Sequence, residues 1–137
     1  METCPHLGFP GTCEEALHFY EQAIGAKIQY LSRYQETAMA AQVPPDFANK
    51  VVHATITIGN SRIMASDAPP DRYSKAHGIA ITLESNSREE GERVFRALTA
   101  GGDIDMPFQE TYWSPGFGMG RDKFGIPWMV NTTRPQS

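Results

Sequence analysis

The chain has 137 residues, 40% of them hydrophobic and 20% charged, which is the composition of one ordinary globular domain. Twelve basic residues against sixteen acidic ones give a formal net charge of −4, and Lys and Arg form no cluster, so we predict no nucleic-acid partner. No stretch approaches ~18 consecutive apolar residues, and residues 1–5 show no leader pattern, so we predict no membrane association and a cytoplasmic location.

The first predicted elements are a helix and a strand. Thr12 followed by Glu15 is a capping-box pattern, and apolar residues then recur at helical spacing. Gly25 is a typical residue just past a helix end, so we predict a helix over residues 12–24. Residues 27–34 are expected to form a strand, and the polar, proline-containing segment after them is expected to be a surface loop.

Residues 51–67 give the clearest hairpin signal. Apolar side chains alternate with polar ones along its first half, which is the period of a strand with one buried face. Gly59 and Asn60 suit the tight turn that joins the two strands. The alternating apolar residues are Val52, Ala54, Ile56 and Ile58.

The second half repeats the order of the first after a linker rich in Pro and Asp. Residues 78–84 alternate like a strand, and Ser87 with Glu90 is a second capping box, opening a helix over residues 88–100. Further strands are expected over 104–111, over 112–121 and up to residue 132, with a turn at 122–125 before the last. We predict that Ile56, Ile58, Phe95 and Leu98 are buried.

The repeated order of strand, helix and three strands predicts the fold. We expect one α+β domain over residues 1–137, built from two βαβββ modules at about 1–71 and about 72–137. Their strands would form a curved mixed sheet with the helices outside and a concave face on the other side. The alternative from the same pattern is a ferredoxin-like α+β sandwich without a cavity.

The glycine string at residues 116–120 has the form GxGxG and requires an interpretation. A nucleotide loop needs a helix directly after the glycines, so that the helix's first amides meet the phosphate. Here Gly125 and Pro127 follow instead, and we interpret the string as a glycine-rich strand edge. Methyl transfer from a cofactor held by such a loop is therefore not expected.

Several stretches together closely resemble the PhnB-like branch of the vicinal-oxygen-chelate superfamily, which includes glyoxalases and bleomycin-resistance proteins. The resemblance covers nearly the whole chain, and it implies paired βαβββ modules, frequent homodimers and a cavity in which a divalent metal can chelate vicinal oxygens. The stretches are Phe9-x-Gly11, Glu15-Ala16-Leu17-x-Phe19-Tyr20, Gly25-Ala26, His53-Ala54, residues 63–67, Gln109-Glu110-Thr111-x-Trp113 and residues 122–131 with x at 126 and 130.

The resemblance also implies where metal ligands would lie, namely on the first and last strand of each module. The first-strand positions fall near His6 and at Gly78, and the last-strand positions fall at Met64 and Met129. Thioethers are poor ligands for the hard divalent ions of such chemistry. Asp67 could replace one ligand only if a bulge shifted its strand, so we predict no metal and no cofactor.

The candidate site follows from strand alternation. With Gly59 and Asn60 as a two-residue turn, His53 lies opposite Ser66 on the face away from the apolar stripe. Adding the equivalent face of the second module gives a cavity that suits a partly apolar small molecule. We predict that it is lined by His53, Met64, Ser66, Gln109, Trp113, Met129 and Asn131.

Two functions remain open from the sequence. One is a glyoxalase-related enzyme acting on a small metabolite, with His53 or Glu110 as the base. The other is a non-catalytic protein that sequesters a small ligand, as bleomycin-resistance members of the superfamily do. We also predict a homodimer, because short modules leave open sheet edges and members of the superfamily commonly pair.

Overall fold

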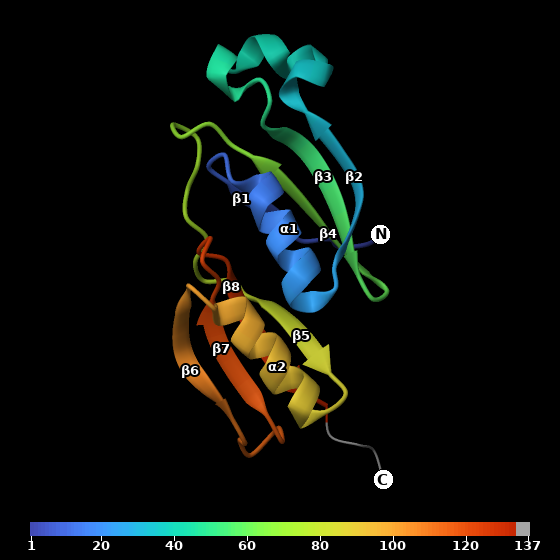
Figure 1. The fold of residues 1–137 in the computed structure, drawn as a ribbon, viewed down its shortest axis with the longest axis vertical. Coiled ribbons are helices and arrows are strands. Elements are labelled where there is room, and N and C mark those ends of the chain that lie inside the picture. The colour runs from blue at the N-terminus through green and yellow to red at the C-terminus, as the bar shows by residue number, and fades with distance from the viewer. Residues whose placement is uncertain (134–137) are drawn as a thin grey trace. The chain divides into compact units, whose positions relative to one another are not determined.

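The first half of the chain forms a complete sheet with one helix on it. A computed structural model describes residues 1–133, which divide into two compact units, one over Met1–Ser74 and one that begins at Lys75 (Figure 1). In the first unit the elements are β1 (His6–Phe9), α1 (Cys13–Ile24), β2 (Lys27–Arg33), β3 (Val51–Ile58) and β4 (Ser61–Asp67). Between β2 and β3 the chain makes three short 3₁₀ turns, Tyr34–Glu36, Ala38–Gln42 and Pro45–Phe47.

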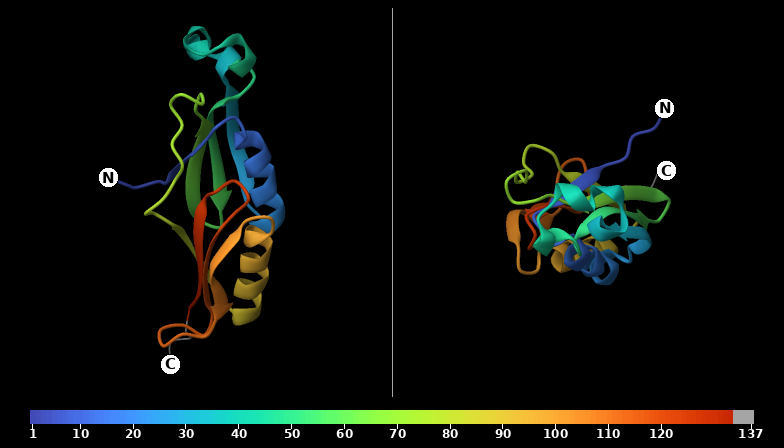
Figure 2. Two further views of the ribbon diagram at one scale, coloured as in Figure 1. Left: turned by 90° about the vertical axis from the view of Figure 1, so that its left-hand side faces the viewer. Right: turned by 90° about the horizontal axis from the view of Figure 1, so that it is seen from above.

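The first sheet has the strand order β1-β4-β3-β2, with β1 parallel to β4 and the other pairs antiparallel. Helix α1 packs against one face of this sheet (Figure 2), and the buried side chains of β3 and β4, such as Ala54, Ile56 and Ala65, face it. Ile58, which we predicted to be buried, is only half-buried because it is the last residue of β3, beside the hairpin turn. The opposite face carries the polar residues of the alternation and is called the first open face below.

The start of α1 differs from the sequence prediction. Thr12 precedes the helix but makes no capping hydrogen bond with its side chain, so the predicted first capping box is wrong. The amides of Gly11 and Cys13 instead donate to the buried carboxylate of Asp67, at 3.0 and 2.8 Å. A cap that comes from the end of β4 leaves no local signal. The end of the helix is as predicted, with Gly25 in the left-handed conformation at φ 71°.

The second unit repeats this arrangement. Its elements are β5 (Ile81–Ser85), α2 (Arg88–Thr99), β6 (Asp103–Gln109), β7 (Phe117–Arg121) and β8 (Pro127–Thr132), in the sheet order β5-β8-β7-β6. Helix α2 covers one face, burying Phe95 and Leu98 as predicted. A Cβ atom at Gly118 would lie 2.9 Å from the Phe95 ring, so a glycine there allows the helix to approach the sheet closely. The face away from α2 is called the second open face.

The α+β class with two βαβββ units is confirmed, and the corrections concern element ends. Strand β5 begins at Ile81 rather than Gly78, because Gly78 takes a φ of 78° outside the strand. Strand β7 begins only at Phe117, after the Ser114 turn, rather than at residue 112. One hydrogen bond of the predicted second capping box is present, since the Ser87 hydroxyl accepts from the Glu90 amide at 3.1 Å.

Two further findings concern nucleotide binding and membrane-spanning helices. The glycine string at 116–120 lies largely in strand β7 and leads through a turn into β8 rather than into a helix, as predicted. It therefore offers no helix N-terminus to a phosphate group. No helix in the described part of the chain is both long and apolar enough to cross a membrane.

Candidate functional site

The first open face is defined by the register of the four strands. Residues directly opposite each other on neighbouring strands share a face. Thr55 is opposite both Tyr30 and Met64, and Met64 is in turn opposite His6. The pairing of β3 with β4 ends at Ala54 and Ala65, and one further step in the same register places His53 opposite Ser66, as the two-residue turn predicted. The register therefore assigns His6, Tyr30, Ser32, His53, Thr55, Met64 and Ser66 to one face.

A histidine pair lies on this face, with His6 on the edge strand β1 and His53 on the interior strand β3. The Nε2 atom of His6 is 2.9 Å from the hydroxyl of Ser66. The ring of His53 lies 6.4 Å from that of His6 and 6.1 Å from that of Tyr30, measured between centroids. Two imidazoles, a hydroxyl and a phenol thus meet on one sheet surface. The sequence prediction included His53 and Ser66 but gave no role to Tyr30, because an exposed aromatic residue on an edge strand has no distinctive local signal.

The environment of His6 favours its neutral form. Partial burial lowers the pKa of His6 below its ordinary value of 6.5, and the neighbouring His53 lowers it further. A neutral imidazole can accept a proton or a hydrogen bond at one nitrogen while donating from the other. Together with Ser66, His6 can therefore orient a polar group of a ligand.

Asp67 has a structural role, not a ligand role. Its carboxylate is 2% exposed and accepts the amides of Gly11, Cys13 and Val51, while its backbone carbonyl accepts the Tyr34 hydroxyl at 2.7 Å. The pairing of β3 with β4 is regular and has no bulge. The side chain therefore faces α1, away from the first open face.

The second open face brings together part of the predicted set. Met129 is opposite Met119, and Asn131 is opposite Phe117, which is in turn opposite Gln109. The ring of Trp113, 44% exposed, packs on Phe117 with centroids 5.2 Å apart. Gln109, Trp113, Met129 and Asn131 are thus neighbours within the second unit, whereas His53, Met64 and Ser66 belong to the first.

Glu84 belongs to this second face and was missed by the sequence reasoning. It is opposite Asn131, whose Nδ2 donates to its carboxylate at 2.9 Å. The amide oxygen Oδ1 of Asn131 is buried without a hydrogen-bond partner among the described residues. The predicted strand over residues 78–84 included Leu83 and Glu84, and their alternation could have indicated this face.

Glu110, the second candidate base, is exposed directly after β6. Its carboxylate makes no hydrogen bond or ion pair within residues 1–133. It lies in the second unit, outside the strands that carry the histidine pair. The structure therefore offers more support for the histidine pair than for Glu110 as a source of acid–base chemistry.

The metal-ligand positions that the resemblance implies can be located by comparing equivalent strand pairs in the two units. In the first sheet His6 is opposite Met64, and in the second Thr82 is opposite Met129. Thr82, rather than Gly78, is therefore the counterpart of His6. One imidazole, one hydroxyl and two thioethers do not fit a hard divalent ion. Over the whole described chain no group of three or more His, Cys, Asp or Glu residues is placed to hold a metal.

Two βαβββ units, each with a helix on one face and an open opposite face, define the class. This is a glyoxalase-like fold, seen also in the glyoxylase/bleomycin resistance protein/dioxygenase domain from Frankia sp. EAN1pec, with a TM-score of 0.69 at 13% identity over 98% of each chain. Within this class the chain belongs to the family described as 3-demethylubiquinone-9 3-methyltransferase, whose model matches residues 1–131.

Closer relatives agree with this assignment. Protein YjdN of Escherichia coli K12 is 38% identical over 146 residues, covering 99% of this chain and 98% of YjdN. The crystal structure of PA1353 from Pseudomonas aeruginosa has a TM-score of 0.88 and 35% identity, covering 98% of this chain and 99% of that one. The structure of a PhnB protein from Bacillus cereus, described as a putative 3-demethylubiquinone-9 3-methyltransferase, has a TM-score of 0.81 and 27% identity, covering 97% of this chain and 100% of that one. The chain is thus PhnB-like.

Proposed function

We propose that the chain binds a small metabolite on the first open face. The observation that carries the proposal is the meeting of His6, His53 and Ser66 on one sheet surface, with the Nε2–Oγ contact of 2.9 Å. Polar groups gathered beside a half-buried thioether, Met64, form the mixture of apolar surface and few polar groups typical of ligand sites.

Each predicted residue has a definite part in this proposal. His53 and Ser66 would bind polar atoms of the ligand, and Met64 would contact its apolar part. Gln109, Trp113, Met129 and Asn131 form a second surface of similar character on their own unit. We keep them as candidate ligand contacts.

In the first candidate function, the chain is a glyoxalase-related enzyme that converts the bound metabolite. The base would be an imidazole of the pair, either His53, as predicted from the sequence, or His6, whose lowered pKa favours its neutral form. Sequestration without turnover is the second candidate. It is supported by the donor set at the metal positions, which does not match the hard ions of metal-dependent members. Methyl transfer, which the family description names, gains no support from the glycine string.

We also propose a homodimer. Strands β1 and β2 are the edges of the first sheet, and β5 and β6 those of the second. Open edges of this kind are commonly covered in stable proteins. Light scattering at micromolar concentration should show a species of about twice the 15.2 kDa chain mass, and a purely monomeric species would contradict the proposal.

The binding proposal is tested by a thermal-shift screen of common metabolites, followed by amide NMR spectra with each hit. A true ligand should shift the amides of β3 and β4, and His53→Ala should abolish the shifts. His18→Ala is the matched control, since His18 lies exposed on α1 beside Glu21. Hits that never perturb β3 or β4, or that bind equally to the His53 variant, would overturn the proposal.

A further inference from the structure

We propose that the ligand of the first open face is a small organic anion whose phosphate or carboxylate group is bound at Arg62 and Lys27. This inference rests on the proposed function and adds the chemical class of the ligand. The two cations belong to a set of directly opposed residues on three neighbouring strands, next to the histidine pair. Thr57, on the central strand β3, is opposite Lys27 on one side and Arg62 on the other.

Both cations are available to a ligand. Lys27 and Arg62 are exposed, and neither is within ion-pair distance of a carboxylate in the part of the chain that the structure describes. This contrasts with Arg33 at the other end of β2, whose guanidinium binds Glu14 through two hydrogen bonds of 2.9 and 3.0 Å. An unpaired arginine on a sheet surface can bind a phosphate or carboxylate through two parallel hydrogen bonds.

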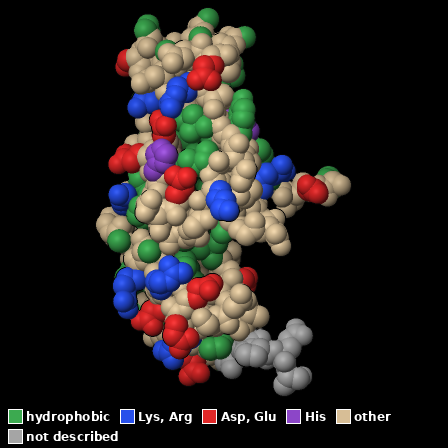
Figure 3. All heavy atoms as spheres, turned by 45° about the vertical axis from the view of Figure 1, so that its right-hand side comes forward, with side chains coloured by type: hydrophobic (Ala, Val, Ile, Leu, Met, Phe, Trp, Pro, Cys, Tyr) green, Lys and Arg blue, Asp and Glu red, His purple; other side chains and the backbone are tan. Residues whose placement is uncertain are grey.

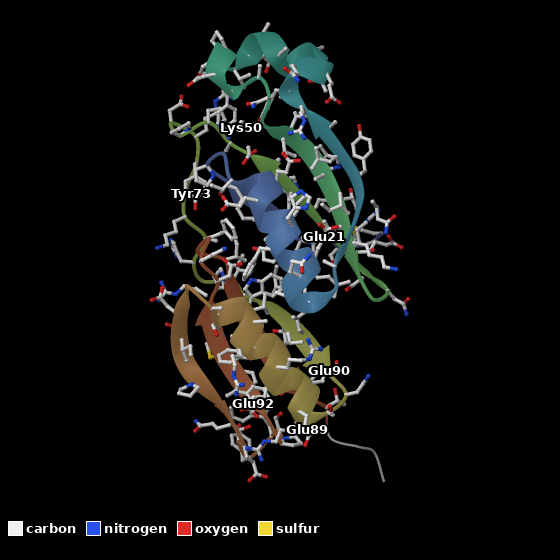
Figure 4. The ribbon with its side chains drawn as sticks, viewed as in Figure 1. Glu21, Lys50, Tyr73, Glu89, Glu90 and Glu92 are labelled. Atoms are coloured by element: carbon white, nitrogen blue, oxygen red, sulfur yellow. The ribbon has the colours of Figure 1, made fainter. Side chains whose placement is uncertain are left out.

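The strand positions of this face carry no acidic residue. Besides Lys27 and Arg62, they hold two histidines, hydroxyl side chains, Tyr30 and Met64. The uncharged side chain of Gln29, in the bulge of β2, also reaches this face, where its Nε2 donates to the Thr57 hydroxyl at 3.0 Å. The acidic residues of the unit's helix, such as Glu21, lie on the other side of the sheet, where Figure 4 shows Glu21 on α1. The surface drawn in Figure 3 differs from the strand positions of the first open face, because it carries acidic and basic side chains next to one another. The first open face therefore favours negative charge in a ligand.

A hollow lies at the Arg62 end of the face. It has a volume of about 690 Å³ and is lined by Thr57, Arg62, the hairpin turn and the N-terminal residues Glu2, Thr3 and Pro5. Glu2 is the one acidic residue in its wall. The hollow provides room for a small molecule beside the Arg62 guanidinium, and Glu2 supplies an opposing charge that a test can remove.

The spacing of the groups sets the size of the ligand. Arg62 and Met64 are two residues apart on β4, which corresponds to about 7 Å along a strand. His6 is opposite Met64, so the imidazole pair begins one row from the cations. A molecule with its anionic group at Arg62 would place its body over Met64 and its far end at His6 and Ser66.

The test uses the full-length protein and three probes of similar shape: phenyl phosphate, benzoate and the uncharged benzyl alcohol. Amide NMR titration should show that at least one anion binds more tightly than benzyl alcohol and shifts amides around Thr57 and Met64. Arg62→Gln should weaken that anion about tenfold, the effect expected for losing a charge-assisted pair. Glu2→Gln should tighten it about two- to threefold, since it removes a solvent-screened repulsion. Arg96→Gln on α2 is the control and should change neither value.

The outcomes separate this inference from the function it extends. Comparing phenyl phosphate with benzoate decides which anionic group the site prefers. Equal binding of all three probes, or anion binding that is insensitive to both Arg62→Gln and Glu2→Gln, would overturn the inference and leave the metabolite proposal standing. Metabolite hits that bypass β3 and β4 would overturn both.

Discussion

The buried carboxylate of Asp67 accepts the backbone amide of Cys13 at 2.8 Å, so the last residue of β4 caps a helix that begins 54 positions earlier. The same carboxylate holds the first residue of β3 through the amide of Val51, at 2.9 Å. One side chain thus joins three segments of the first unit.

Replacing Asp67 by Asn should therefore destabilise the first unit strongly. The amide side chain has one acceptor oxygen for three donors, and its NH₂ group would face backbone amides. We expect a loss of about 2–4 kcal/mol in the free energy of unfolding, measured by urea denaturation. The matched control is Asp46→Asn in an exposed 3₁₀ turn, which should stay within about 0.5 kcal/mol. Equal stability of both variants would refute the structural role given to Asp67.

The histidine pair predicts a specific pH behaviour. Because the folded pKa of His6 lies below the unfolded value of 6.5, its neutral form stabilises the fold above that pH. This contribution is lost as the pH falls below 6.5 towards the folded value. An NMR titration of the imidazole resonances should show His6 titrating below the free-histidine value. His53→Gln should raise the pKa of His6 part of the way, and His18→Gln should not; a His6 pKa above 6.5 would contradict the geometry.

Close packing between α2 and its sheet predicts that alanine substitutions at two glycines, Gly120 and Gly8, differ in their effect on stability. A Cβ atom at Gly120 would lie 2.6 Å from the carbonyl oxygen of Asp103 and 2.7 Å from the Cγ2 atom of Thr99. Gly120→Ala should therefore cost about 1–3 kcal/mol of stability through overpacking. A Cβ atom at Gly8 meets no atom within 4 Å, and Gly8→Ala should be neutral within about 0.5 kcal/mol. Similar melting temperatures for the two variants would show that α2 does not approach β7 as described.

The contact between Glu84 and Asn131 can be tested by exchanging the carboxylate and the amide between the two positions. Asn131→Asp places a second carboxylate 2.9 Å from the first, and the two should repel at neutral pH. Adding Glu84→Gln should restore a hydrogen bond in the opposite direction. We expect a coupling free energy on the order of 0.5–1 kcal/mol in a double-mutant cycle at pH 7, because the pair is open to solvent. The coupling should shrink near pH 4, and additivity at both pH values would count against the contact.

The fold was largely predictable because its signals are local. Alternation along residues 51–58, the glycine after α1 and the serine before α2 each depend on neighbours in sequence, and the repeat of element order then gave the architecture. Long-range features were missed. The cap supplied by Asp67 and the late start of β5 depend on partners far along the chain, which one sequence does not display.

The candidate site was predictable only where alternation determined a face. His53 and Ser66 follow from the hairpin, and the register bears out their shared face, although their role in binding stays a prediction. Thr82 was missed because a three-residue error in the start of β5 moved the expected ligand position to Gly78. Glu84 lay within the predicted strand, but its partner Asn131 is 47 positions further along the chain. Tyr30 was missed because an exposed aromatic residue on an edge strand has no distinctive local signal, and a bulge in β2 also changes the alternation there.

The duplicated architecture gives this chain an evolutionary freedom that a single sheet lacks. Each unit completes its own strand pairing and buries its own helix, so substitutions on one open face leave the hydrogen bonds of the other sheet intact. The counterparts His6 and Thr82, or Ser66 and Asn131, show how far two copies of one surface can diverge on an unchanged framework. Selection for a new ligand can therefore act on one half while the other half continues to supply stability.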